Sequence, residues 1–193
     1  MRLMLNIFSV AILSIIFFSC GEQVTSSYET SGNSEINKNA VTILGDLSPE
    51  EAEGILIMRQ EEKVARDVYT NLGQTWNSNI FERIKLAEQN NMDALKVLIV
   101  RYNLIDPVIN DEVGVFADPT FQQMFDNFVQ QGRQSLTDAF IVGQTIEEDD
   151  IAALENQLSF VDNQDIIKVY TNLKAASERH LQAFLNHITS SAF

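Results

Sequence analysis

Apolar residues recur every three or four positions along most of this chain, and few helix breakers interrupt them. The 193 residues include only 8 Gly and 3 Pro, and the prolines stand at positions 49, 107 and 119. Apolar residues at this spacing line one face of a helix, whereas a strand-rich fold would need more turn residues. The sequence therefore predicts an all-α protein.

Four long helices are predicted. Ser48, Pro49 and Glu51 mark the start of the first, because a Ser N-cap, a Pro at the first helical position and a Glu three residues after the cap favour helix initiation. A break at residues 73–78 separates it from the second helix, which ends before Asp106. The third and fourth helices are predicted over residues 134–158 and 162–190.

The connection between the second and third long helices is about thirty residues long, which is unusual between adjacent antiparallel helices. It contains Pro107, Gly114, Pro119 and Gly132, and a short apolar helix is predicted over residues 118–131. Two helical hairpins joined by a long crossover are typical of a ferritin-like four-helix bundle, in which cofactor sites are built from facing core side chains.

The N-terminus has the pattern of an export signal. Arg2 precedes an apolar run from Leu3 to Phe18, which is too short for a spanning helix and ends at a small-residue stretch around Cys20. This pattern predicts a lipoprotein signal peptide over residues 1–19, with Cys20 lipidated and the protein anchored to the membrane of the bacterial cell envelope. A plain signal peptide with an incidental cysteine is the alternative.

Residues 20–46 are rich in Ser, Thr, Asn and Glu and are predicted to form a polar tether, so the bundle domain is assigned to residues 47–190. The formal charge of −14 argues against nucleic acid as a partner. The single Cys excludes an internal disulfide and an all-cysteine metal site.

Each long apolar stripe is interrupted by polar residues at a similar depth in the bundle. Burying a carboxylate without a partner costs several kcal/mol, so these interruptions require an explanation. Four carboxylates and one imidazole suit iron or manganese, one or two ions, because oxygen and nitrogen ligands offset the charge of a hard or borderline cation. The predicted metal ligands are Glu62, Glu88, Glu147, Asp150 and His180.

Several side chains are predicted to support these ligands, and some alternatives stay open. Helical periodicity does not choose between Glu61 and Glu62 as the ligand from the first helix. Tyr69 and Tyr170 are candidates for hydrogen bonds to buried carboxylates, or are core aromatics. The full set of supporting residues is Asn91, Ser177, Tyr69 and Tyr170.

Four segments resemble an uncharacterised bacterial and archaeal family of ferritin-like domains over residues 47–190. They are residues 61–69, 87–92, 143–151 and 177–184. The pattern Glu62-x-x-Ala65-x-x-x-Tyr69 is similar to the first-helix signature of ferritins, which favours Glu62 over Glu61. The resemblance implies Glu-x-x-His in the second and fourth helices.

This chain departs from that pattern, because Asn91 stands where the second helix would carry His and Ser177 stands where the fourth would carry Glu. One metal ion held by Glu62, Glu88, Glu147 and His180, or a metal-free site, therefore competes with a two-metal centre. The sequence predicts an exported, lipid-anchored ferritin-like domain that binds a divalent metal and has redox chemistry. Whether it is an enzyme stays open, and the alternative is a non-enzymatic envelope module with a degenerate, metal-free site.

Overall fold

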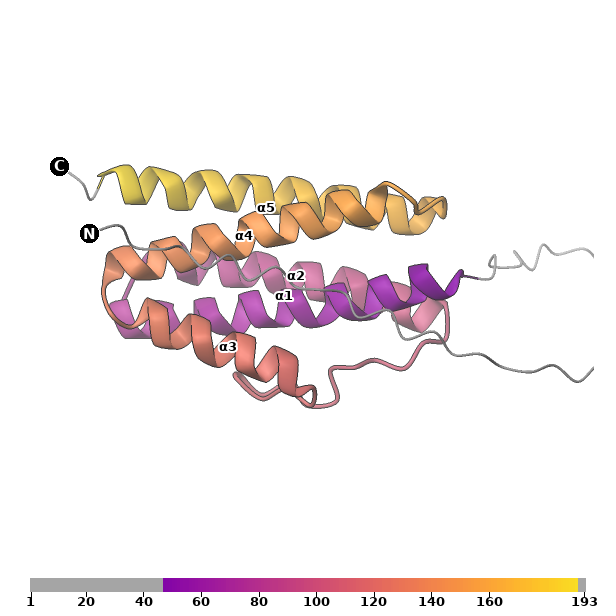
Figure 1. Cartoon of the computed structure of the whole chain (residues 1–193), viewed down its shortest axis with the longest axis horizontal. Coiled ribbons are helices and arrows are strands. Elements are labelled where there is room, and N and C mark those ends of the chain that lie inside the picture. Colours follow the sequence, from indigo (N-terminus) through magenta and orange to yellow (C-terminus); the bar gives the residue numbers. More distant parts are fainter. Residues whose placement is uncertain (1–46, 191–193) are drawn as a thin grey trace, which may run out of the picture. The chain divides into compact units, whose positions relative to one another are not determined.

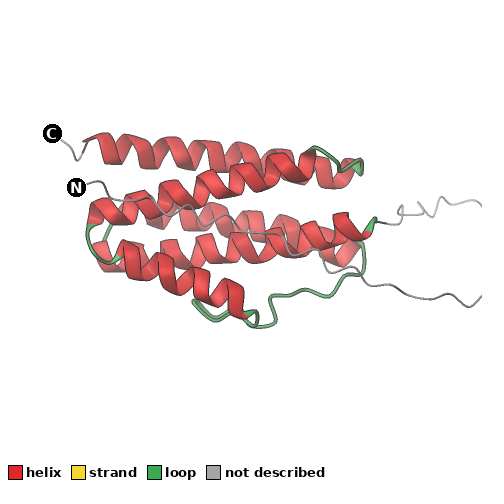
Figure 2. Ribbon diagram, viewed as in Figure 1, coloured by secondary structure: helices red, strands yellow, loops and turns green. Residues whose placement is uncertain are grey.

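The computed structural model describes residues 47–190, and in this part of the chain all regular secondary structure is helical. The predicted signal peptide, Cys20 and the whole of the predicted tether lie outside the described residues. No helix among those described is long and apolar enough to cross a bilayer. The prediction of an all-α protein is confirmed, and the helices are α1 (Pro49–Trp76), α2 (Asn79–Arg101), α3 (Pro119–Gly132), α4 (Leu136–Leu158) and α5 (Gln164–Ser190) (Figures 1 and 2).

Two antiparallel hairpins, α1/α2 and α4/α5, form most of the domain (Figure 1). α1 also packs on α4, and α2 packs on α5, an arrangement that is compatible with a four-helix bundle. The short helix α3 lies against α1 and α4, so it covers one side of the two hairpins. No described element covers the α2–α5 side in the same way.

The helix starts follow the sequence signals. Ser48 and Glu51 form the reciprocal capping box, and the side chains of Asp118 and Ser135 accept hydrogen bonds from the first turns of α3 and α4. The predicted break at residues 73–78 is shorter in the structure, because α1 continues to Trp76. It ends at Asn77, whose φ of 49° is in the left-handed region.

Gly73 therefore lies inside α1 and does not form the turn. A Cβ at Gly73 would come within 3.1 Å of the Phe81 Cβ and 2.9 Å of Glu82 Oε1. The residue is small because α1 and α2 approach each other closely here, a reason that local turn preferences do not reveal.

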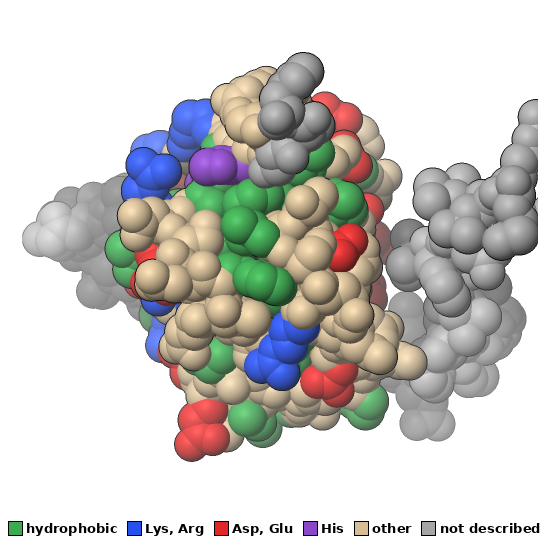
Figure 3. Space-filling view, turned by 90° about the vertical axis from the view of Figure 1, so that its left-hand side faces the viewer, with side chains coloured by type: hydrophobic (Ala, Val, Ile, Leu, Met, Phe, Trp, Pro, Cys, Tyr) green, Lys and Arg blue, Asp and Glu red, His purple; other side chains and the backbone are tan. Residues whose placement is uncertain are grey.

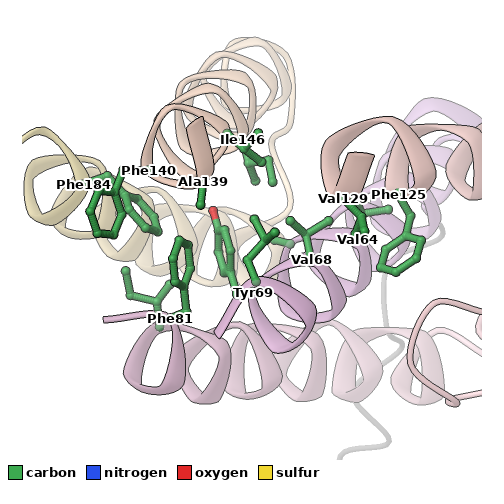
Figure 4. Packing of buried hydrophobic residues seen from close by; sticks show 14 of the residues in the cluster. Val64, Val68, Tyr69, Phe81, Phe125, Val129, Ala139, Phe140, Ile146 and Phe184 are labelled. Carbon is green, nitrogen blue, oxygen red and sulfur yellow. The ribbon is translucent and has the colours of Figure 1, made fainter. Parts of the chain in front are cut away.

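The apolar core has two parts. The aromatic cluster contains Tyr69, Phe81, Phe140 and Phe184 with the aliphatic side chains around them, and Figure 4 shows these rings meeting between the helices. The aliphatic cluster lies toward the other end, with Ile55, Met58, Leu95, Leu154 and Leu173 among its members. At the end of the domain where α1 and α5 finish, apolar side chains gather at the centre of the surface and charged side chains lie around them (Figure 3).

A buried ion network attaches the crossover to α1. The Asp67 carboxylate accepts hydrogen bonds from Lys63, from Arg66 Nε at 2.8 Å and from the Gly114 backbone N–H at 2.9 Å. Arg66 also pairs with Asp111 of the crossover at 2.8 Å. Lys63 and Asp67 are almost fully buried, so each charge depends on its partners for stabilisation.

Candidate metal site

A polar layer separates the aromatic cluster from the aliphatic cluster. In each long helix, the polar residues stand between a member of one cluster and a member of the other along the chain. These residues are at least nine-tenths buried. The members of the polar layer are Glu62 from α1, Glu88 and Asn91 from α2, Glu147 and Asp150 from α4, and Ser177 and His180 from α5.

Three members of the layer, on three different helices, form the candidate ligand group. One ligand atom from each of Glu88, Glu147 and His180 lies within 4.8 Å of the other two. His180 Nδ1 is 2.8 Å from Glu88 Oε1 and 3.6 Å from Glu147 Oε1. Two carboxylates and an imidazole at this separation could hold a metal ion.

Two neighbours orient the carboxylates by hydrogen bonds. Tyr69 donates its hydroxyl to Glu147 Oε1 at 2.7 Å. The side-chain amide of Asn91 donates to Glu88 Oε2 at 2.8 Å and to Glu62 Oε2 at 3.1 Å. Asn91 therefore links two predicted ligands. It binds one carboxylate oxygen of each and leaves the other oxygen available.

Several polar atoms of the layer lack hydrogen-bond partners within the described part of the chain. All of them are buried. Unpaired buried polar atoms are rare in native proteins, and each requires a reason such as an ion or a water. Four atoms of the polar layer have no such partner, namely Glu62 Oε1, Glu147 Oε2, Asp150 Oδ2 and Ser177 Oγ, whereas Glu88 Oε1 and His180 Nδ1 face each other at 2.8 Å.

Four other residues near the layer are not members of it. Tyr170 packs in the aliphatic cluster, and its hydroxyl has no hydrogen-bond partner among the described residues. Glu61 is half-buried, whereas its neighbour Glu62 is fully buried. Asp149 is exposed. His187 is exposed, and its ring lies 5.0 Å from the ring of Phe140.

Burial and mutual repulsion dominate the electrostatics of the layer. Burial, followed by repulsion from Glu88, raises the pKa of Glu62 and brings the pKa of Glu147 to about 7. Burial and the charge of Glu147 also raise the pKa of Asp150. Burial alone would lower the pKa of His180, but its contacts with Glu147 and Glu88 outweigh burial and raise that pKa to about 10.

These shifts predict an unusual pH dependence for the metal-free protein. The folded state holds protons on Glu147 and His180 at pH values where the unfolded chain, with pKa values of 4.5 and 6.5, has released them. Stability is therefore lost as pH rises through this window, by roughly 1–3 kcal/mol between pH 5 and 8. Thermal melts in EDTA across this range should show a falling Tm, whereas a rising Tm would contradict the assigned protonation states.

The site and the fold define an all-α protein with a buried Glu/Glu/His group that could hold a metal ion. The chain belongs to the family described as uncharacterized protein domain DUF2202, whose model matches residues 51–192. It is similar to the uncharacterized protein MJ0754 of Methanocaldococcus jannaschii, with 46% identity over 144 residues, or 75% of this chain and 78% of that protein.

A solved structure agrees with this relationship. The chain resembles the crystal structure of hypothetical protein MJ0754 from Methanococcus jannaschii with a TM-score of 0.74 and 43% identity. The match covers 82% of this chain and 87% of that chain.

Proposed function

We propose that this protein is a ferritin-like domain that binds a divalent metal ion, iron or manganese, in the polar layer. The observation that carries the proposal is the convergence of Glu88, Glu147 and His180 within 4.8 Å, with buried unpartnered carboxylate oxygens on Glu147 and on the neighbouring Glu62 and Asp150. Glu62 and Asp150 are further carboxylate donors in the same layer. A bound iron or manganese ion would supply Lewis-acid or redox chemistry.

The donor set fits this class of metal. Carboxylates favour hard cations, and one imidazole extends the set toward borderline metals such as iron and manganese. Tyr69 and Asn91 hold the carboxylates in place through the hydrogen bonds described above, as supporting residues do around many metal sites. We also propose that the domain is exported and anchored to the envelope membrane through lipidated Cys20, by way of the tether of residues 20–46.

Metal binding by the purified full-length protein tests the proposal. Elemental analysis should detect bound metal, and anaerobic titration with Fe²⁺ or Mn²⁺ should show saturable binding. The variant His180→Ala should bind these ions roughly 100-fold more weakly, because it loses the only imidazole of the layer. His187→Ala is the matched control on the same helix and should retain normal binding. Absence of binding by the natural protein, or equal binding by both variants, would refute the proposal.

The second candidate function is a non-enzymatic envelope module with a metal-free site. The hydrogen bonds from Asn91 to Glu62 and Glu88 favour it, because they satisfy part of the polar layer without an ion. This alternative predicts that added Fe²⁺ or Mn²⁺ leaves the Tm unchanged. A metalloprotein should instead gain stability as the free metal concentration rises above the Kd of the site.

A further inference from the structure

We propose that Glu61 and Asp150 form a second cation position on the α1–α4 side of the polar layer, through which a divalent cation reaches Glu88, Glu147 and His180. This inference rests on the proposed metal-binding function. It gives a role to Glu61, which helical periodicity alone did not distinguish from Glu62. Of the two neighbours, Glu62 lies in the polar layer and Glu61 lies beside it, half-buried.

The register between α1 and α4 places the two carboxyl groups opposite each other. Near one end of the pair, a Cβ at Gly54 would come within 2.4 Å of Gln157 Oε1. Glu61 follows Gly54 by seven residues, and Asp150 precedes Gln157 by seven residues. α1 and α4 run in opposite directions (Figure 1). Seven residues make about two helical turns, so Glu61 and Asp150 return to the side on which Gly54 and Gln157 meet.

A second contact gives nearly the same register further along. The Tyr69 hydroxyl reaches the Gly143 carbonyl oxygen at 3.5 Å. Tyr69 lies seven residues after Glu62 on α1, and Gly143 lies seven residues before Asp150 on α4, so this contact aligns Glu62 with Asp150. The two contacts together place Asp150 level with the Glu61–Glu62 pair, and Asp150 interacts electrostatically with Glu61.

The two facing carboxyl groups are incompletely satisfied. Asp150 is only 5% exposed, and its Oδ2 atom has no hydrogen-bond partner among the described residues. The Oε2 atom of Glu61 is also buried and unpartnered there. Two carboxyl groups that face each other without donors are destabilising, and a cation between them would offset this cost.

Acidic side chains connect this position to the core site and to the surface. Asp150 interacts electrostatically with Glu147 and Glu88 on one side and with Glu61 and Asp149 on the other. Asp149 is exposed, and Ile57 and Ala153 beside the pair are half-buried. A cation can therefore move from Asp149 past Glu61 and Asp150 to the core ligands while it stays near a carboxylate.

The α2–α5 side of the layer offers no such run of acids. The residues of the layer that are most exposed are Asn91 and His180, one on each of these helices. An amide carries no charge, and a protonated imidazole repels cations. The charges thus favour cation entry on the α1–α4 side, at the level of Glu61 and Asp150, which lies beyond the buried members of the aromatic cluster that α3 joins.

Stopped-flow loading of the full-length protein with Co²⁺, followed by its visible absorption bands, tests the route. Glu61→Gln should slow loading at least fivefold, because it removes an entry charge while keeping the side-chain shape. Ala153→Leu should also slow loading, because a larger side chain three residues from Asp150 narrows the approach. Ala153→Leu should reach the final Co²⁺ stoichiometry and spectrum of the natural protein, whereas Glu61→Gln, which lacks a ligand of the second position, should do so only at the core ligands Glu88, Glu147 and His180.

Two matched controls accompany these variants. Glu148→Gln removes the same charge from an exposed position on α4, and Ala94→Leu enlarges a half-buried alanine on α2. Both should load at the natural rate. If Glu61→Gln and Ala153→Leu load as fast as their controls, the entry position is refuted while metal binding stands. If the natural protein takes up no Co²⁺, Fe²⁺ or Mn²⁺, the proposed function and this inference both fail.

Discussion

Replacing Glu62 and Glu147 together with glutamine is expected to raise the Tm of the metal-free protein at pH 8 and to abolish its stabilisation by metal. Burial and repulsion raise the pKa of both carboxyl groups, so their ionised forms are costly in the folded state. Glutamine keeps a carbonyl oxygen that can accept from Tyr69 and Asn91. The gain should be about 2 kcal/mol, or roughly 5 °C in Tm.

The double variant should also lose the rise in Tm that metal gives the natural protein. The natural protein should melt higher with excess Mn²⁺, whereas the double variant should melt at the same temperature with and without it. Differential scanning calorimetry at pH 8, with EDTA or with Mn²⁺, measures both effects. A double variant that is less stable than the natural protein in EDTA would show that the two carboxylates are structural, and would contradict the interpretation of the polar layer as a ligand set.

Replacing Asp67 with alanine is expected to be the most destabilising single change outside the polar layer. The carboxylate pairs with Lys63 and Arg66 and accepts the Gly114 backbone N–H. Its loss removes the buried counter-charge of both cations, although Arg66 keeps Asp111 and Lys63 keeps the Glu112 carbonyl. Breaking a buried ion pair in this way costs about 3–5 kcal/mol. For a domain of this size, the Tm should fall by roughly 10 °C.

The control for this change is Asp93→Ala, at an exposed position within α2. It should alter stability by less than about 0.5 kcal/mol. Chemical denaturation in urea gives both values. If the two aspartate variants have equal stability, the ion network does not hold the crossover against α1. Limited proteolysis should also cut the crossover of the Asp67→Ala variant faster, because Gly114 loses its attachment to α1.

Local signals predicted the helices well because they act over one or two turns. The capping box at Ser48 and the cap at Asp118 are present as expected, and the polar interruptions of the stripes are buried. The main departure is the end of α1, where Gly73 suggested a turn. Its role depends on the distance to Phe81 of the neighbouring helix, which the sequence of α1 does not encode.

Contacts between helices decided the details of the site. Periodicity assigns a residue to a face of its own helix, but the register between two helices depends on how their side chains interlock. At Gly143, a Cβ would come within 2.6 Å of the Phe184 ring, so α4 and α5 approach closely near the site. This packing helps to determine that Tyr69 reaches Glu147, whereas Tyr170 stays in the aliphatic cluster.

The sequence by itself thus determined an all-α domain with costly polar groups at one depth, because helix initiation and amphipathic spacing are local properties. Only the tertiary structure decided that Glu88, Glu147 and His180 lie within 4.8 Å and that Asn91 links two carboxylates. These relations join residues on different helices, and their distances depend on side-chain packing across the whole core.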